Sequence, residues 1–293
     1  MFRLRLFKIS DISNDTKRNR KVKLNIIQIE SKKINTLKVI VPNMDYIEQY
    51  FKNICTLFEK IVTEEKENIE KAADILSRAI IEDRLIHVVG TGGHSYIGAE
   101  EIFYRAGGLI PVDAIFEPSI SLSFGALRST ALERTVGIMP KVLDLYNLKP
   151  KDPLIIVNAY GINAATIDTA LEARKKGLTV IAITSVSFSK SVPADHPARH
   201  PSKKNLYELA DVVVDSKMPF GDAMIKIDGL EQKVGPVSTI LNAFVLNSII
   251  IKTVEKLLEK GVTPPIWVSA NIPGGDEANK KWIEKYKGII RHL

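Results

Sequence analysis

Long apolar runs and cysteines are scarce in this chain, and each absence excludes a class of protein. No uncharged apolar run reaches the ~18 residues that suggest a membrane-spanning helix. The single cysteine among 293 residues, Cys55, excludes an intrachain disulfide and a cysteine-rich zinc site. The N-terminal residues alternate apolar with basic side chains and lack the apolar centre of a signal peptide. We therefore expect a cytoplasmic protein that makes no contact with a membrane.

Acidic residues are also scarce, but only at the N-terminal end. Residues 1–43 contain eleven Lys or Arg and three acids, a net charge of +8, whereas the rest of the chain has 30 basic and 31 acidic residues, a net charge of −1. This basic segment alternates like strands around a polar turn at residues 14–21. It is a β-hairpin that packs on the body, a basic arm that touches nucleic acid or an anionic partner, or an artefact of start-site choice with Met44 as the true first residue. The segment lacks a helix-turn-helix pattern, so we do not expect nucleic acid as the partner.

From Met44 onward the pattern predicts a single α/β domain, residues 44–293. Apolar residues recur at helical spacing from 47 to 80, which predicts two helices in a hairpin. Apolar strands then alternate with helices, and a long helix opens at Gly235-Pro236 with proline in its first turn. We expect strands near 85–89, 109–115, 154–157, 178–183 and 211–215, and helices near 95–106 and 131–146. Such alternation predicts a parallel sheet covered on both faces, with ligands at the carboxyl ends of its strands.

The first strand, 85–89, runs into a loop with three glycines that let the backbone come close to a ligand. The loop consists of Gly90, Thr91, Gly92, Gly93, His94 and Ser95. A dinucleotide-binding fingerprint requires glycine at the position of Ser95, so we do not favour a nicotinamide cofactor. The alternative is a glycine-rich turn that serves packing alone.

A second loop of this kind follows the strand 154–157 and precedes a helix that stops at Gly177. Free backbone N–H groups at a helix N-terminus attract anions such as phosphate. Asn158 and Gly161 lie in the loop, and Asn163 is suited to cap the helix. The next strand ends in Thr184 and Ser185, which we also expect beside the ligand.

Several motifs resemble, in this order, those of the SIS (sugar isomerase) domain family. They read GTGGHS, AEEIFYRAGGL, EPS, LEARKKGLTVIAITS, HPSKKNLYELADVVVD, GDA, QKVGPVST and SANIPGGDE, and they extend over residues 44–279. The branch in question is similar to phosphoheptose isomerases and muramic acid phosphate etherases. The resemblance implies a three-layer α/β/α sandwich with a five-stranded parallel sheet that binds a phosphorylated sugar. It also implies a homodimer or homotetramer, and we expect no cofactor.

The chain departs from that family at two positions. The family's second loop has the form S-N-S-G-x-N, whose serine hydroxyls hold the sugar phosphate, but here Asn158 and Tyr160 replace the serines. Tyr160 either fills the space of the phosphate or reaches a ligand with its hydroxyl from further away. Relatives in the branch have a His-Glu-Gly-Ala stretch where this chain has residues 123–126, so Phe124 replaces an acid.

Aldose–ketose isomerisation and ether elimination both need a base and an acid poised near neutral pH. Glu101 follows His94 by seven residues, which places both on one helix face, so we expect this pair to be catalytic. Glu133 lies at the start of the predicted helix 131–146, where the helix dipole favours an acid. Lys233, near the Gly235-Pro236 helix start, is a candidate partner of the phosphate.

His196 and His200 are four residues apart, but Pro197 and Pro201 prevent a shared helix face, so we expect no metal site. The sequence therefore predicts a protein that binds a phosphorylated sugar or carbohydrate derivative, as a sugar-phosphate isomerase or a related lyase. The alternative function is a non-catalytic module that senses a sugar phosphate.

Overall fold

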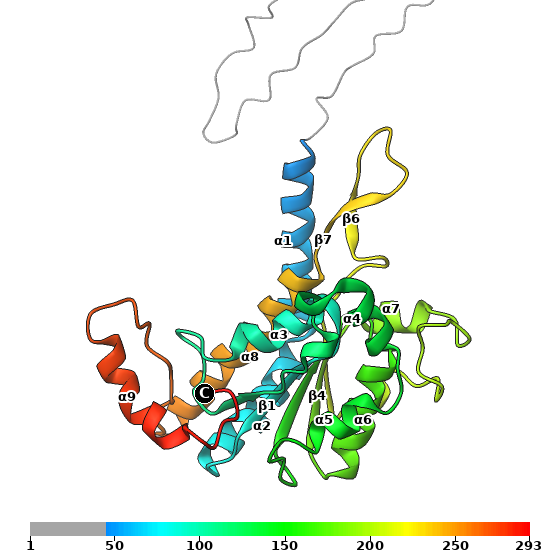
Figure 1. Cartoon of the computed structure of the whole chain (residues 1–293). Helices are drawn as coiled ribbons and strands as arrows, with labels where there is room; N and C mark the ends of the chain where they lie inside the picture. The colour runs from blue at the N-terminus through cyan, green and yellow to red at the C-terminus, as the bar shows by residue number, and fades with distance from the viewer. Residues whose placement is uncertain (1–44) are drawn as a thin grey trace, which may run out of the picture. The chain divides into compact units, whose positions relative to one another are not determined.

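A five-stranded parallel sheet forms the centre of this computed structural model, which describes residues 45–293 (Figure 1). The strand order is β2-β1-β3-β4-β5. The strands are β1 (Ile86–Gly90), β2 (Val112–Ala114), β3 (Pro153–Val157), β4 (Thr179–Thr184) and β5 (Val212–Asp215). β1, β2 and β3 are buried along their whole length, which explains their uninterrupted apolar runs. The predicted α/β sandwich with a five-stranded parallel sheet is confirmed, while the basic segment 1–43 lies outside the described residues.

An apolar core lies on each face of the sheet. Ile155 and Val157 of β3 belong to one core and Leu154 and Ile156 to the other, because successive strand residues point to opposite faces. The first core packs against α2 (Lys66–Ile81), α3 (Tyr96–Ile102) and α8 (Ser238–Glu259). The second packs against α5 (Ile138–Leu143) and α6 (Ala164–Lys175). None of the helices in residues 45–293 combines the length and apolar character needed to cross a bilayer.

The remaining elements are short or lie outside the two layers. They are α1 (Tyr46–Glu64), α4 (Ala126–Glu133), α7 (Val186–Ser191), α9 (Gly275–Tyr286), the 3-10 turns η1 (Gly93–Ser95), η2 (Pro118–Ile120), η3 (Leu122–Phe124) and η4 (Leu206–Glu208), and an antiparallel pair, β6 (Ala223–Lys226) with β7 (Lys233–Pro236). Residues Tyr50–Leu293 form one compact unit, and the description below concerns that unit.

Three predicted helix boundaries were wrong. Glu65 alone separates α1 from α2, so the two helices do not have the connecting turn that a hairpin requires. The predicted helix 131–146 is instead the end of α4, at Glu133, and the separate helix α5, which Gly137 precedes with a left-handed φ of 90° that a continuous helix does not allow. α8 begins at Ser238, so Pro236 ends β7 and does not occupy the helix's first turn.

A buried histidine joins the strands at the end of the sheet where β1 and β3 begin. His87 of β1 is fully buried, with Nδ1 at 3.2 Å from Asp113 Oδ2 and Nε2 at 3.4 Å from Asp152 Oδ2. Arg84 Nη1 lies 3.1 Å from Asp152 Oδ1. Burial alone would lower the pKa of His87, but the two carboxylates outweigh burial and raise it above its usual value. When protonated, His87 forms an ion pair with each of the two carboxylates and so links β1 to β2 and to the start of β3.

We expect this link to make the stability of the fold depend on pH. Because the pKa of His87 is raised above its ordinary value of 6.5, the stabilisation is complete below pH 6.5 and is lost as the pH rises through the higher pKa of the folded chain. In urea unfolding, His87→Gln should cost about 3–5 kcal/mol at mildly acidic pH, the range for removing one partner of a buried ion pair. His94→Gln, which changes an exposed side chain, is the control. Equal pH dependence in wild type and His87→Gln would contradict the assignment.

Candidate functional site

The two loops that the sequence singled out lie side by side at the carboxyl ends of β1 and β3. Thr91 N–H donates to Val157 O at 3.2 Å, and the Thr91 and Thr166 hydroxyls are 2.7 Å apart. Asn158 Nδ2 donates to Thr91 O at 2.8 Å. Thr91 is fully buried and its polar atoms are occupied by these contacts, so it joins the loops and is not exposed to a ligand.

Asn158 determines the path of the second loop. Its Oδ1 accepts hydrogen bonds from the N–H groups of Tyr160, at 3.1 Å, and Gly161, at 2.8 Å. These two N–H groups belong to the expected anion cradle, and each already has an acceptor inside the protein. Asn158 is also buried, so its amide shapes the loop and does not face a ligand.

The glycines of the two loops serve different purposes. A Cβ on Gly90 would lie 2.0 Å from Ser95 O, and one on Gly161 would lie 2.6 Å from Thr184 Oγ1, so both glycines permit close packing inside the protein. Gly92, with φ of 118°, would bring a Cβ to 2.2 Å from Glu133 Oε2. Gly93 has no atom within 4 Å of such a position and borders open space.

Glu133 is the carboxylate that lies against both loops. Its Oε2 approaches Gly92, and its Oε1 accepts a hydrogen bond from Asn163 Nδ2 at 3.3 Å. Glu133 ends α4, so its prediction at a helix start was wrong; at a helix C-terminus the dipole disfavours an acid. Burial raises the pKa of Glu133, and the opposing effect of Arg134 is smaller. Half-buried and poorly compensated, this carboxyl is suited to proton transfer.

A cavity of about 350 Å³ opens beside Glu133. Its polar lining is Glu133, Arg134, Asn163, Ser191 and His196, and its apolar lining is Tyr160, Ile162, Phe188, Val192, Pro193, Ala198 and Phe220, with Gly221 at the edge. Of the residues predicted to bind substrate, this cavity contains Asn163 alone. The side chain of Asn163 does not cap α6, and its Nδ2 donates to Glu133 Oε1.

The predicted catalytic pair does not meet at this cavity. Glu101 Oε1 accepts from Asn247 Nδ2 of α8 at 2.9 Å and lies 3.3 Å from Arg105 Nε. His94 is exposed and lies in η1, before α3 begins at Tyr96. The expectation of a shared helix face was therefore wrong, because the spacing of seven residues crosses a 3-10 turn.

Three further predicted ligand residues have other positions. Thr184 is fully buried beneath Gly161. Ser185 is fully buried, and its hydroxyl donates to Met218 O at 2.7 Å and accepts from Phe188 N at 3.3 Å, which caps α7. Lys233 is exposed on β7 and does not line the cavity.

The sequence excluded His196 as a metal ligand and assigned it no other role, and it left two roles open for Tyr160; both residues line the cavity. His196 lines the cavity, whereas His200 Nε2 lies 3.1 Å from Asp168 Oδ1. Tyr160, which stands in place of a family serine, packs its ring 4.6 Å from that of Phe188. Burial raises the pKa of Tyr160, so its hydroxyl stays protonated.

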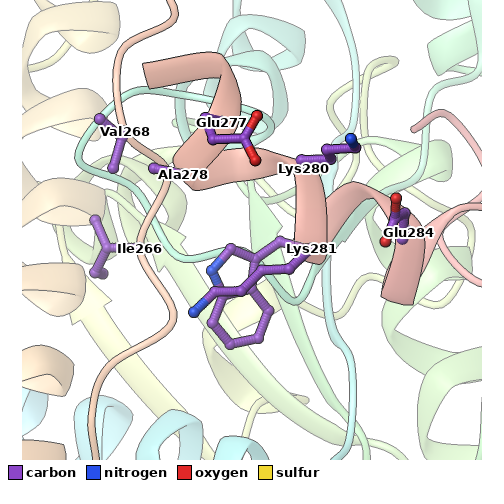
Figure 2. A pocket seen from close by; sticks show the side chains of 8 residues that line it. Ile266, Val268, Glu277, Ala278, Lys280, Lys281 and Glu284 are labelled. Atoms are coloured by element: carbon purple, nitrogen blue, oxygen red, sulfur yellow. The ribbon is translucent and has the colours of Figure 1, made fainter. Parts of the chain in front are cut away.

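A larger hollow, of about 700 Å³, lies between α9 and the segment that contains Ile266 and Val268 (Figure 2). Lys281 Nζ lies 5.0 Å from the centre of the Trp282 ring in this hollow. None of its lining residues comes from the loops that follow β1, β3 or β4. In parallel sheets ligands bind at the carboxyl ends of the strands, so the cavity beside Glu133 is the candidate site.

We compared the sequence and the fold of this chain with those of known proteins to identify its family. The model of the SIS domain matches residues 49–185. A UPF0309 protein of Geobacillus thermodenitrificans is 41% identical over 244 residues, which cover 83% of this chain and 96% of that protein. A UPF0309 protein of Caldanaerobacter subterraneus is 40% identical over 251 residues, covering 85% and 98%. Phosphoheptose isomerase GmhA from Neisseria gonorrhoeae shares the fold, with a TM-score of 0.50 at 14% identity over 71% of this chain and 97% of that one.

Asn158→Ala should destabilise the protein by about 3 kcal/mol, because two loop N–H groups and one carbonyl lose their partner together. Unfolding in urea measures this cost. Asn271→Ala, at an exposed asparagine, is the matched control and should change stability by less than about 0.5 kcal/mol. Equal stability of the two variants would contradict the role of Asn158 in joining the loops.

Proposed function

Since the chain belongs to the UPF0309 family of SIS-domain proteins, we propose that it binds a phosphorylated sugar in the cavity beside Glu133 and moves protons on it, as an isomerase or a related lyase. The fold shared with a phosphoheptose isomerase supports this proposal at the level of ligand class. The cavity volume of about 350 Å³ is in the range of small-molecule sites.

The phosphate is held by groups other than serine hydroxyls. The twelve-residue helix α6 begins beside the cavity and directs the positive end of its dipole there. Arg134 and His196 line the same cavity and supply cationic or donor groups. These groups take over the task that the resemblance assigns to serine hydroxyls at positions 158 and 160. The N–H groups of Tyr160 and Gly161 are not free for it, because they donate to Asn158 within the loop.

The role of Glu133 is proton transfer. The proposal rests on one observation, the partly buried Glu133 carboxylate that lines the cavity and lies against both loops. Isomerisation moves a proton from one carbon to its neighbour, and a carboxylate whose pKa approaches the working pH does this efficiently. Burial shifts the pKa of Glu133 in that direction. His196, which also lines the cavity, is the candidate acid for the carbonyl oxygen.

A non-catalytic sugar-phosphate sensor is the second candidate function. It is favoured by Phe124, which replaces the family acid, and by the N–H groups of Tyr160 and Gly161, which are bonded to Asn158. The homodimer or homotetramer implied by the family resemblance remains a prediction. The same ligand experiment separates the enzyme from the sensor.

We expect hexose and heptose phosphates, screened by thermal shift, to raise the melting temperature of the wild type. With a ligand that is turned over, Glu133→Gln should lower kcat at least about 100-fold, the usual contribution of general acid–base catalysis, while ligand-induced stabilisation persists. Activity should fall as the pH drops through the raised pKa of Glu133, because the base then becomes protonated.

Glu101→Gln is the discriminating variant, because Glu101 was the carboxylate expected from sequence. Loss of turnover in Glu101→Gln with full activity in Glu133→Gln would assign the chemistry to Glu101 and overturn the role of Glu133. Stabilisation by a sugar phosphate without turnover would favour the sensor. No stabilisation by any phosphosugar would overturn both functions.

A further inference from the structure

Three aromatic side chains form one side of the candidate cavity. The ring centres of Tyr160 and Phe188 are 4.6 Å apart, and those of Phe188 and Phe220 are 5.2 Å apart. All three residues line the cavity, and they come from the loop after β3, from α7 and from the segment after β5. We call them the aromatic wall. Phe220 is 70% exposed within the part of the chain that the structure describes, and exposing so large an apolar ring to water is costly.

The segment that carries Phe220 has an unusual backbone. Lys217, Gly221 and Asp222 all have left-handed φ values, of 56°, 80° and 67°. This region is unfavourable for lysine, and such strain persists only where the surroundings enforce it. The segment 217–222 is therefore a constrained turn, which we call the arch.

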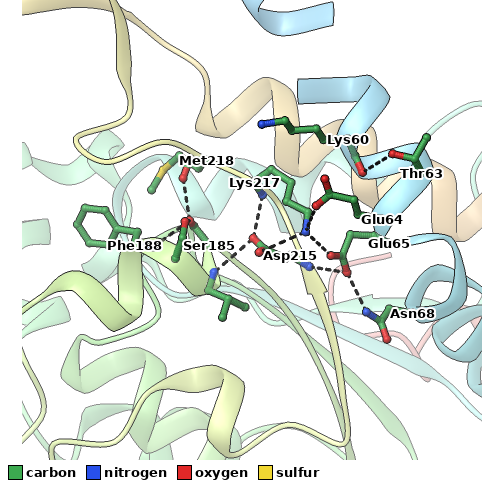
Figure 3. A network of polar contacts seen from close by, with 12 residues as sticks. Lys60, Thr63, Glu64, Glu65, Asn68, Ser185, Phe188, Asp215, Lys217 and Met218 are labelled. Carbon is green, nitrogen blue, oxygen red and sulfur yellow. Dashed lines mark hydrogen bonds and ion pairs between the residues drawn. The ribbon is translucent and has the colours of Figure 1, made fainter. Parts of the chain in front are cut away.

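The first end of the arch is held by an ion-pair network (Figure 3). Lys217 Nζ lies 2.5 Å from Glu65 Oε1, 3.0 Å from Glu64 Oε2 and 3.5 Å from Asp215 Oδ2. Burial alone would lower the pKa of Lys217, but these carboxylates outweigh it and raise the pKa. Glu65 is buried, and its Oε2 also accepts from Asp215 N at 3.2 Å. The arch is thereby tied to the junction of α1 and α2.

The second end is held at the N-terminus of α8. Asp222 Oδ1 accepts from the N–H groups of Val237, at 2.9 Å, and Ser238, at 2.7 Å, and its Oδ2 accepts from Ser238 Oγ at 2.8 Å. Between the two ends, Met218 is fully buried and its carbonyl accepts from Ser185 Oγ. Phe220 is therefore presented at the cavity by a backbone that is fixed on both sides.

We infer that the aromatic wall packs against the apolar face of the sugar ring, so that the ligand enters as a ring-form sugar phosphate, whose ring opens before a proton is moved at its carbonyl group, and Phe220 determines the preference for the ring form. A closed sugar ring presents a flat patch of C–H groups, whereas an open-chain polyol presents hydroxyls on all sides and loses more rotational freedom on binding. An aromatic surface fixed before binding favours the rigid, partly apolar ligand. This inference rests on the proposed function, since it describes the ligand of the same cavity.

Ligands that share the phosphate but differ in ring closure test the inference. Calorimetry compares the methyl glycoside 6-phosphates of glucose, mannose and galactose, whose rings cannot open, with the corresponding hexitol 6-phosphates, which cannot close. For the preferred sugar, the wild type should bind the locked ring about tenfold more tightly or better. Phe220→Ala should lose most of this preference and bind the hexitol phosphate as the wild type does, and Phe220→Tyr should keep the preference.

Phe124→Ala is the matched control, since Phe124 is 59% exposed and does not line the cavity, and it should behave as the wild type. Equal affinities of wild type for ring and open-chain ligands, or an equal loss of both in Phe220→Ala, would overturn the inference while leaving sugar-phosphate binding intact. Absence of binding by every ligand of either kind would overturn the proposed function as well. Circular dichroism establishes that each variant is folded.

Discussion

The structure of the site depends on one buried amide. Asn158 donates to Thr91 O in the loop after β1 and accepts the N–H groups of Tyr160 and Gly161 in its own loop. With these three bonds it fixes the spacing of the two loops against which Glu133 lies. The same bonds satisfy two N–H groups of the expected anion cradle, so these two groups are not free to bind an anion.

The hydrogen bonds of Asn158 also influence which side chains line the cavity. Asn158 holds the loop after β3 through the N–H groups of Tyr160 and Gly161. In this loop conformation the Tyr160 ring packs against Phe188 and lines the cavity. Glu133 comes against Gly92 because that glycine has no side chain to keep the carboxylate away. The cavity therefore combines a half-buried acid, the start of α6 and an aromatic wall, a combination that suits the ligand proposed above.

The sheet was predictable from the sequence, and several helix boundaries were not. Strands such as 154–157 and 179–184 are buried on both faces, so their uninterrupted apolar runs carry a strong signal. The break at Gly137 and the late start of α8 depend on local backbone angles and on the β6–β7 pairing, which apolar spacing does not record. Misplacing the helix around Glu133 made its carboxylate look like an ordinary helix-start acid.

The sequence by itself determined the α/β class, the two glycine-containing loops and their meeting at the carboxyl edge of the sheet, because apolar periodicity and turn residues act locally. Only the tertiary structure decided which polar groups remain for a ligand. Asn158 and Ser185 are buried and hydrogen-bonded within the protein and Thr184 is buried, whereas Glu133, His196 and Phe220 come from segments distant in sequence and share one cavity. The physical reason is that burial and hydrogen-bond pairing depend on neighbours that the fold supplies, and a list of residue types does not reveal them.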